Sequence, residues 1–206
     1  IGRIIKKCIS MKSIYFCNGF LLSLFFCFSS YSVDAQVQIP EKVGMWANIT
    51  GFAINSTEDY MVVSIMVVGK EKLYETTFTS GNWNELKPIE PINTFGDGTV
   101  SICNPSLSFD GKKLFFQADF ADTKGGYDIY YSIRSSEGWG KPINIGEPIN
   151  TAADECYPSV SPGEDQLYFS ISQPNLEFRK PKESGVCQKI YQSVKSPKSE
   201  WTTPVP

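Results

Sequence analysis

The sequence contains no histidine. This absence excludes Ser-His-Asp triads, Cys-His pairs and histidine metal ligands, because each of them needs an imidazole. Only carboxylate, lysine, tyrosine or cysteine chemistry remains open to the chain. Together with the repeat and the export signal described below, this absence leads us to expect a protein that is not an enzyme, with no catalytic residue, no cofactor and no metal ion.

Clustered positive charge and long apolar runs are missing as well. The net charge is −3, whereas proteins that bind phosphate backbones gather Lys and Arg on one surface. The densest apolar run covers only residues 20–28, and a membrane-spanning helix needs about 20 apolar residues. We expect no nucleic-acid partner, and no transmembrane span once the N-terminal signal is cleaved.

The N-terminal region has the features of an export signal. Lys12 follows a plausible start at Met11, the apolar run comes next, and Ala35 precedes a suitable signal-peptidase cut. The expected division of the chain is an upstream extension at 1–10, a signal peptide at 11–35 and a mature repeat domain at 36–206.

Three cysteines remain in the mature part: Cys103, Cys156 and Cys187. No two cysteines have the C-x-x-C spacing of a metal site, so zinc binding is unsupported. Cys103 and Cys156 each lie two residues before a repeated proline, and so occupy equivalent places in the repeat. Because a disulfide needs Cα atoms within about 7 Å, we expect both thiols to be reduced, or at most one strained bond between them.

An internal repeat organises the mature chain. The stretch 104–116 (NPSLSFDGKKLFF) recurs as 157–169 (YPSVSPGEDQLYF), and the tetrapeptide Pro-Ile-Asn-Thr occurs at 91–94 and again at 148–151. A repeat of roughly 50 residues with short strands and a tryptophan in each copy is typical of β-propeller blades. We expect an all-β fold of four-stranded antiparallel blades, located at 48–94, 103–151 and 156–206.

Strands can be placed within the second copy. Period-2 alternation predicts strands at 105–109, 113–118 and 127–134, and an outer strand from Trp139 to about Ile145. Asp110-Gly111 is the expected hairpin turn, where glycine takes a positive φ. Phe115 and Phe116 should point to opposite faces of the sheet.

The same residues carry a family resemblance. The string P-S-x-S-x-D-G-K-x-L-x-F at 105–116, followed by G-G-x-D-I-Y at 125–130 and then a Trp-to-Pro step, resembles the TolB-type (WD-repeat-like) β-propeller repeat of bacterial OmpA-associated envelope proteins. The resemblance implies a periplasmic or outer-membrane-associated propeller that contacts other envelope proteins. Peptidoglycan binding in that family depends on a separate domain that is missing from this sequence.

Three acidic residues are candidates for a channel or ligand site: Asp154, Glu155 and Asp97. In propellers the first strand of a blade starts near the central channel, where a carboxylate pair could bind a cation or act as general acid and base. The alternative is that the two carboxylates are exposed to solvent or cap the segment. The aspartates at 119, 122 and 128 are interpreted as a polar loop in which Asp128 pairs locally.

Two functions remain open on this sequence. The first is a non-catalytic scaffold or protein-binding propeller in the bacterial envelope. The second is a carbohydrate-active or glycan-binding propeller, which would need channel carboxylates about 5–10 Å apart. A peptidase propeller would require a G-x-S-x-G hydrolase elbow, which the sequence lacks. Since propellers close with about four to eight blades, we also expect the chain to be part of a longer protein with at least one more blade.

Overall fold

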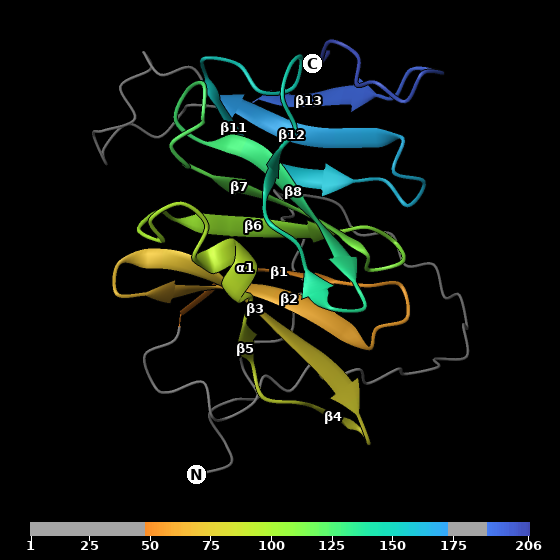
Figure 1. The fold of residues 1–206 in the computed structure, drawn as a ribbon. Helices are drawn as coiled ribbons and strands as arrows, with labels where there is room; N and C mark the ends of the chain where they lie inside the picture. The colour runs from red at the N-terminus through yellow and green to blue at the C-terminus, as the bar shows by residue number, and fades with distance from the viewer. Residues whose placement is uncertain (1–47, 173–188) are drawn as a thin grey trace, which may run out of the picture. The chain divides into compact units, whose positions relative to one another are not determined.

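The computed structural model describes residues 48–172 and 189–206. The expected upstream extension, the signal peptide and Cys187 lie outside the described residues. Within the described chain no helix is long and apolar enough to cross a membrane. Three antiparallel sheets follow one another in chain order, from orange through green to blue (Figure 1).

The first sheet is built around a hairpin of two long strands. Its path runs β1-β2-β3-β4, and β5 also pairs with β3. The strands are β1 (Asn48–Ile54), β2 (Tyr60–Val67), β3 (Lys70–Thr79), β4 (Asn82–Trp83) and β5 (Lys87–Pro88). One helical turn, α1 (Glu90–Asn93), leads out of it, with Pro91 where the missing amide costs nothing.

The second sheet repeats this arrangement with the order β10-β8-β7-β6, and β9 pairs with β8. Its strands are β6 (Ile102–Leu107), β7 (Lys113–Ala118), β8 (Asp128–Ser135), β9 (Gly138–Trp139) and β10 (Ile143–Asn144). The prediction for β7 is confirmed to the residue. The prediction of one continuous outer strand was wrong, because this segment pairs with β8 in two short strands, β9 and β10, on either side of Pro142.

The third sheet has the order β11-β12-β13. Its strands are β11 (Asp154–Val160), β12 (Gln166–Ser172) and β13 (Lys189–Val194). Trp201 pairs with Lys195 as Trp139 pairs with Arg134, and Val205 pairs with Gln192 as Ile143 pairs with Tyr131. The third copy therefore begins its outer strand in the register of the second. The fold class is confirmed: the described chain consists of propeller blades.

The repeated turn between the first two strands of a blade has the same construction in each copy. Ser108 Oγ accepts from Lys113 N at 2.9 Å, and Ser161 Oγ accepts from Gln166 N at 3.0 Å. Asn55 takes this place in the first sheet, where its side chain accepts from Tyr60 N. Gly111 has the expected positive φ, 69°. Asp110 accepts from Lys112 N within this turn, which supports the turn interpretation.

Two apolar cores join the sheets face to face. The larger lies between the first and second sheets and includes Val62, Leu73, Leu114, Phe116 and Tyr130. The second lies between the second and third sheets and is centred on Phe115, Ile129, Leu167 and Phe169. The opposite orientation of Phe115 and Phe116 is thus confirmed. Since burying one such side chain contributes roughly 1.5–3 kcal/mol, these interfaces hold the blades together.

Hydrogen bonds from the second sheet also protect the exposed edge of β11. Glu155 N donates to Tyr127 O at 2.7 Å, Tyr157 N to Gln117 Oε1 at 2.8 Å, and Val160 N to Ser106 Oγ at 3.2 Å. An uncovered edge strand would invite unwanted pairing with other chains. The second blade therefore supplies acceptors for the first strand of the third blade.

Candidate functional site between the second and third sheets

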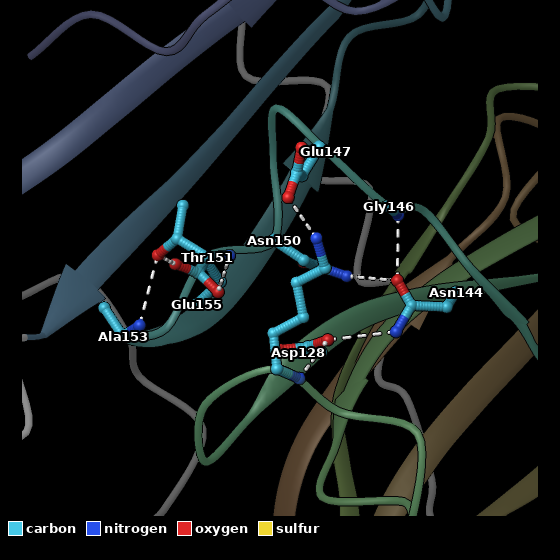
Figure 2. A network of polar contacts seen from close by, with 9 residues as sticks. Asp128, Asn144, Gly146, Glu147, Asn150, Thr151, Ala153 and Glu155 are labelled. Carbon is cyan, nitrogen blue, oxygen red and sulfur yellow. Dashed lines mark hydrogen bonds and ion pairs between the residues drawn. The ribbon is translucent and has the colours of Figure 1, made fainter.

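The candidate pair Asp154 and Glu155 lies at the start of β11, against the loop that enters β8. Figure 2 shows Glu155 beside Thr151 and Ala153, with Asp128, Asn144 and Asn150 forming a neighbouring group. The residues that surround the pair come from the end of the second blade and the start of the third. The site is therefore a polar joint between two blades.

Glu155 is fully buried. Thr151 N donates to its Oε2 at 3.1 Å and Thr151 Oγ1 to its Oε1 at 2.5 Å, while Ala153 N donates to Thr151 Oγ1. Burial raises the pKa of Glu155 to about 7, against the opposing effect of the Thr151 hydrogen bonds. The side chain closes a tight loop at 151–155 and does not face solvent.

Asp154 connects the 151–155 loop to the second blade through hydrogen bonds. Its Oδ1 accepts from Tyr127 N at 3.0 Å, and its Oδ2 accepts from Ser172 Oγ at 3.3 Å. A Cβ atom on Gly125 would lie 2.0 Å from Ala153 O, and one on Gly126 would lie 2.0 Å from Asp154 Oδ1. The two glycines are needed because the third blade passes directly over them.

Asn150 holds the entry segment against β8. Ile129 N donates to its Oδ1, and its Nδ2 donates to Ile129 O, both at 2.9 Å. The same Nδ2 donates to Asn144 Oδ1 at 2.7 Å, and Asn144 Nδ2 donates to Asp128 Oδ2 at 2.9 Å. This chain of contacts is drawn in Figure 2. A buried amide that pairs with both backbone groups of one residue works as a fixed clamp.

The first blade contains the same clamp. Leu73 N donates to Asn93 Oδ1 at 2.9 Å, and Asn93 Nδ2 donates to Leu73 O at 2.7 Å. Beside it, Lys72 takes the place that Asp128 has in the second blade, and its ammonium donates to three backbone carbonyls. The Pro-Ile-Asn-Thr repeat is thus explained by a buried isoleucine and a clamping asparagine.

Asp128 is fully buried, and its Oδ1 has no hydrogen-bond partner among the described residues. Lys124 N and Asn144 both donate to Oδ2. Burial raises the pKa of Asp128, and these donors only partly oppose the effect. The local pairing that the sequence predicted is confirmed, but its partners are the amides of a structural joint.

Asp97 does not join Asp154 and Glu155. Its side chain is exposed and accepts from Thr99 N and Thr99 Oγ1 at 2.9 and 2.7 Å. These hydrogen bonds lower the pKa of Asp97. Among the described residues no three acidic or thiol side chains gather in an arrangement that could hold a metal ion. The structure therefore brings together two of the three candidates, and places the third in a separate turn.

A second feature of the inner strands was not assigned from the sequence. Asn104 and Tyr157 occupy equivalent β-bulges and have positive φ values of 53° and 56°. Gln117 Oε1 accepts from both Asn104 Nδ2 and Tyr157 N at 2.8 Å. The first blade has Gly51 at its bulge, next to the Asn104 side chain and Pro105. The three bulges thus lie in neighbouring inner strands.

Left-handed backbone is costly for a side chain larger than asparagine. Tyr157 nevertheless keeps this conformation with 57% of its surface exposed. Glycine would adopt this backbone conformation with less strain, yet the position holds an exposed tyrosine. Tyr157 is therefore a candidate contact residue. The available sequence signal was its place directly before the repeated proline.

The thiols of Cys103 and Cys156 are buried and free. Burial raises the pKa of the Cys103 thiol well above its usual range and that of Cys156 to about 12. Both thiols therefore stay protonated at neutral pH and are poor nucleophiles. The expected reduced state agrees with the structure.

Comparison with known proteins concerns the fold. No family model matches the sequence, and no curated protein is similar to it. Solved structures that it resembles include a putative TolB from Agrobacterium tumefaciens (12% identity, TM-score 0.49, covering 74% of this chain and 46% of that chain). TolB from Acinetobacter baumannii is also similar (10% identity, TM-score 0.47, 78% and 33%). A third is the β-propeller domain of the Trilobed protease from Pyrococcus furiosus (12% identity, TM-score 0.43, 78% and 42%). The chain thus spans less than half the length of these proteins.

Proposed function

We propose that this chain is a non-catalytic propeller module that is exported and binds other proteins of the bacterial cell envelope. The observation that carries the proposal is the pair of strained bulges on neighbouring inner strands, which hold the Tyr157 side chain towards solvent. Tyrosine is enriched at protein interfaces, because it offers a large apolar ring with a polar tip.

The candidate acidic pair supports a binding role over a catalytic one. Asp154 accepts from Tyr127 and Ser172, and Glu155 accepts twice from Thr151. Carboxylates used in this way hold the second and third blades in register. The export signal at 11–35 and the TolB-type repeat support the envelope location.

The test is affinity capture from an envelope extract, with the tagged 36–206 protein as bait. Tyr157→Gly removes the exposed ring, keeps the amide that binds Gln117, and relieves backbone strain. We expect it to lose the captured proteins while its thermal stability stays equal or rises.

The matched control is Val68→Gly, which relieves the same kind of strain at an exposed position on the β2–β3 turn, where Val68 has a φ of 48°. This variant should capture the same proteins as the original chain. Equal capture by the Tyr157→Gly protein, or no capture above a tag-only bait, would reject the proposed function.

A further inference from the structure

One position of the repeat carries opposite charges in successive blades. Lys72 and Asp128 each directly precede the residue that a clamping asparagine holds. Strand register places Lys189 at this position in the third blade. The second blade therefore has a carboxylate where the other two have a lysine. We call the contact between the first two blades the first joint, and the contact between the second and third blades the second joint.

In the first joint the Lys72 ammonium lies among backbone oxygens. It donates to Asn93 O, Gly98 O and Val100 O at 3.2, 2.8 and 3.0 Å. All three carbonyls belong to the segment that leads from the first blade into the second. Carbonyl oxygens gathered in this way stabilise a positive charge, whether an ammonium or a metal ion carries it.

The second joint repeats this segment without the ammonium. The clamp and the inner-strand bulges make Asn150 and Ala153 the equivalents of two of the three residues that hold the lysine. Ala153 O lies against the loop before Asp128, because a Cβ on Gly125 would be 2.0 Å from it. Asn144 links Asp128 to the Asn150 side chain through two hydrogen bonds (Figure 2). The carboxylate and both carbonyl groups thus belong to one small region.

The negative charge of the second joint has no cationic partner in the described chain. Asp128 is 0% exposed, its Oδ1 accepts no hydrogen bond there, and it forms none of the ion pairs among the described residues. The lysine of the same loop, Lys124, pairs with Glu147 instead. Glu155, also 0% exposed, takes the place that Ile102 has in the first joint. Burying carboxylates without a counter-charge is costly.

We propose that the second joint binds a Ca²⁺ ion, at the position that the Lys72 ammonium has in the first joint. Asp128 Oδ1 and the carbonyl oxygens of Asn150 and Ala153 are its protein ligands, and water completes the coordination. Ca²⁺ fits this set because it takes carboxylate and backbone carbonyl oxygens and tolerates irregular geometry. Its charge balances the two buried carboxyl groups, of Asp128 and Glu155.

This ligand set predicts weak binding. It has one carboxylate and neutral carbonyls, and no three acidic or thiol side chains of the described chain gather around a common point. We therefore expect a dissociation constant on the order of 10⁻⁴ to 10⁻³ M, the range of sites with few charged ligands. The inference goes beyond the protein-binding proposal, because the ion holds two blades together and does not depend on Tyr157.

The test measures the melting temperature of the purified protein after a chelator has removed metal ions, in CaCl₂ and in NaCl of the same ionic strength. We expect Ca²⁺ at about 10 mM to raise the melting temperature by about 5 °C, since a ligand that binds only the folded state stabilises it. No rise beyond that in NaCl would mean that a water molecule or a proton satisfies Asp128 Oδ1, and would overturn the inference.

Two changes at Asp128 should remove this rise for different reasons. Asp128→Asn takes away the charge of the ligand. Asp128→Lys supplies an ammonium of its own, as Lys72 does in the first joint, and should melt without Ca²⁺ at or above the temperature of the original protein without Ca²⁺. Asp97→Asn is the matched control, because it removes an exposed carboxylate, and it should keep the full rise.

Terbium luminescence gives a readout that does not depend on stability, should a variant fail to fold. Tyr127 and Tyr130 flank Asp128 in the sequence, so their excitation should sensitise emission from Tb³⁺ at the site, and Ca²⁺ should reduce this emission by competition. The Asp97→Asn protein should behave in the same way, and neither Asp128 variant should. A full Ca²⁺ response in either Asp128 variant, or no Ca²⁺-sensitive emission from the original protein, would overturn the inference.

Discussion

At the scale of single residues, two asparagines do the same work in successive blades. Asn150 and Asn93 each pair with the amide and the carbonyl of one residue in the third strand, Ile129 and Leu73. Both side chains are buried, so no solvent replaces the amide when it is removed. Removing the asparagine side chain should therefore destabilise the fold, because it leaves one backbone amide and one backbone carbonyl without a hydrogen-bond partner.

We therefore expect Asn150→Ala to lower the free energy of unfolding by about 2–4 kcal/mol, because each unsatisfied buried group costs roughly 1–3 kcal/mol. Asn93→Ala should cost a similar amount, and Asn82→Ala, at an exposed strand position, should cost less than about 0.5 kcal/mol. Urea unfolding of the three variants is the measurement. A loss below 1 kcal/mol for Asn150→Ala would contradict the clamp.

Glu155 gives a pH dependence with a definite sign. Its pKa is about 7 in the folded protein against 4.5 for the free group, so the folded state holds its proton more firmly. The contribution of Glu155 to the free energy of unfolding should therefore be largest below about pH 4.5. It should fall by up to about 3 kcal/mol as the pH rises towards 7. The raised pKa of Asp128 acts in the same direction.

Glu155→Gln should abolish this part of the slope, because the amide stays neutral and its one oxygen still accepts from one of the two Thr151 donors. We expect the variant to be more stable than the original protein at pH 8 and similar to it near pH 4.5. Unfolding free energies between pH 4 and pH 8 decide the question. A variant that keeps the full slope would show that Glu155 does not cause it.

The sequence identified Asp154 and Glu155 as a pair, but not what the pair does. Their partners are the amides of Thr151 and Tyr127 and the hydroxyl of Ser172, which only the folded chain brings together. The spacing of residues in the sequence does not distinguish a carboxylate that faces the channel from one that is buried, because burial depends on how the neighbouring blade packs. The repeated asparagine was visible, while its bidentate contact was not.

At the scale of elements, strand positions followed from alternation and turns, and failed where proline interrupts a strand. The strand at 113–118 was predicted correctly. The strand before it was predicted to start at Pro105, yet β6 begins at Ile102 and passes through a bulge at that proline. A bulge leaves one residue outside the ladder, so it accommodates proline without losing a pairing.

The loop before β8 depends on two glycines for space and not for a positive φ. A Cβ on Gly125 would meet the backbone of Ala152 and Ala153, which cannot move without displacing β11. We expect Gly125→Ala to destabilise the protein by more than about 2 kcal/mol, as overpacking against backbone does.

Gly163→Ala is the control for this prediction. There the added Cβ would meet only the flexible Asp165 side chain, at 3.1 Å. Its effect on the melting temperature should be close to zero. If Gly125→Ala were equally mild, the close approach of the third blade to this loop would be wrong.

At the scale of the whole molecule, the second sheet is shared by both cores. Phe116 packs towards the first sheet and Phe115 towards the third. In arrays of this kind, stability is the sum of each unit and its interfaces with its neighbours. A mutation that weakens one interface should therefore also destabilise a sheet that does not form that interface, provided that the interfaces are strong.

Phe116→Ala tests that coupling. The change should cost about 3–5 kcal/mol, as expected for a fully buried phenylalanine. Since the second sheet supports the third, hydrogen exchange at β12 amides such as those of Leu167 and Phe169 should accelerate together with exchange at β2. Phe109→Ala, at an exposed turn position, should leave both unchanged. If β12 kept its full protection while β2 lost it, the third blade would be stable without its neighbours, and the blades would have to be treated as independent domains.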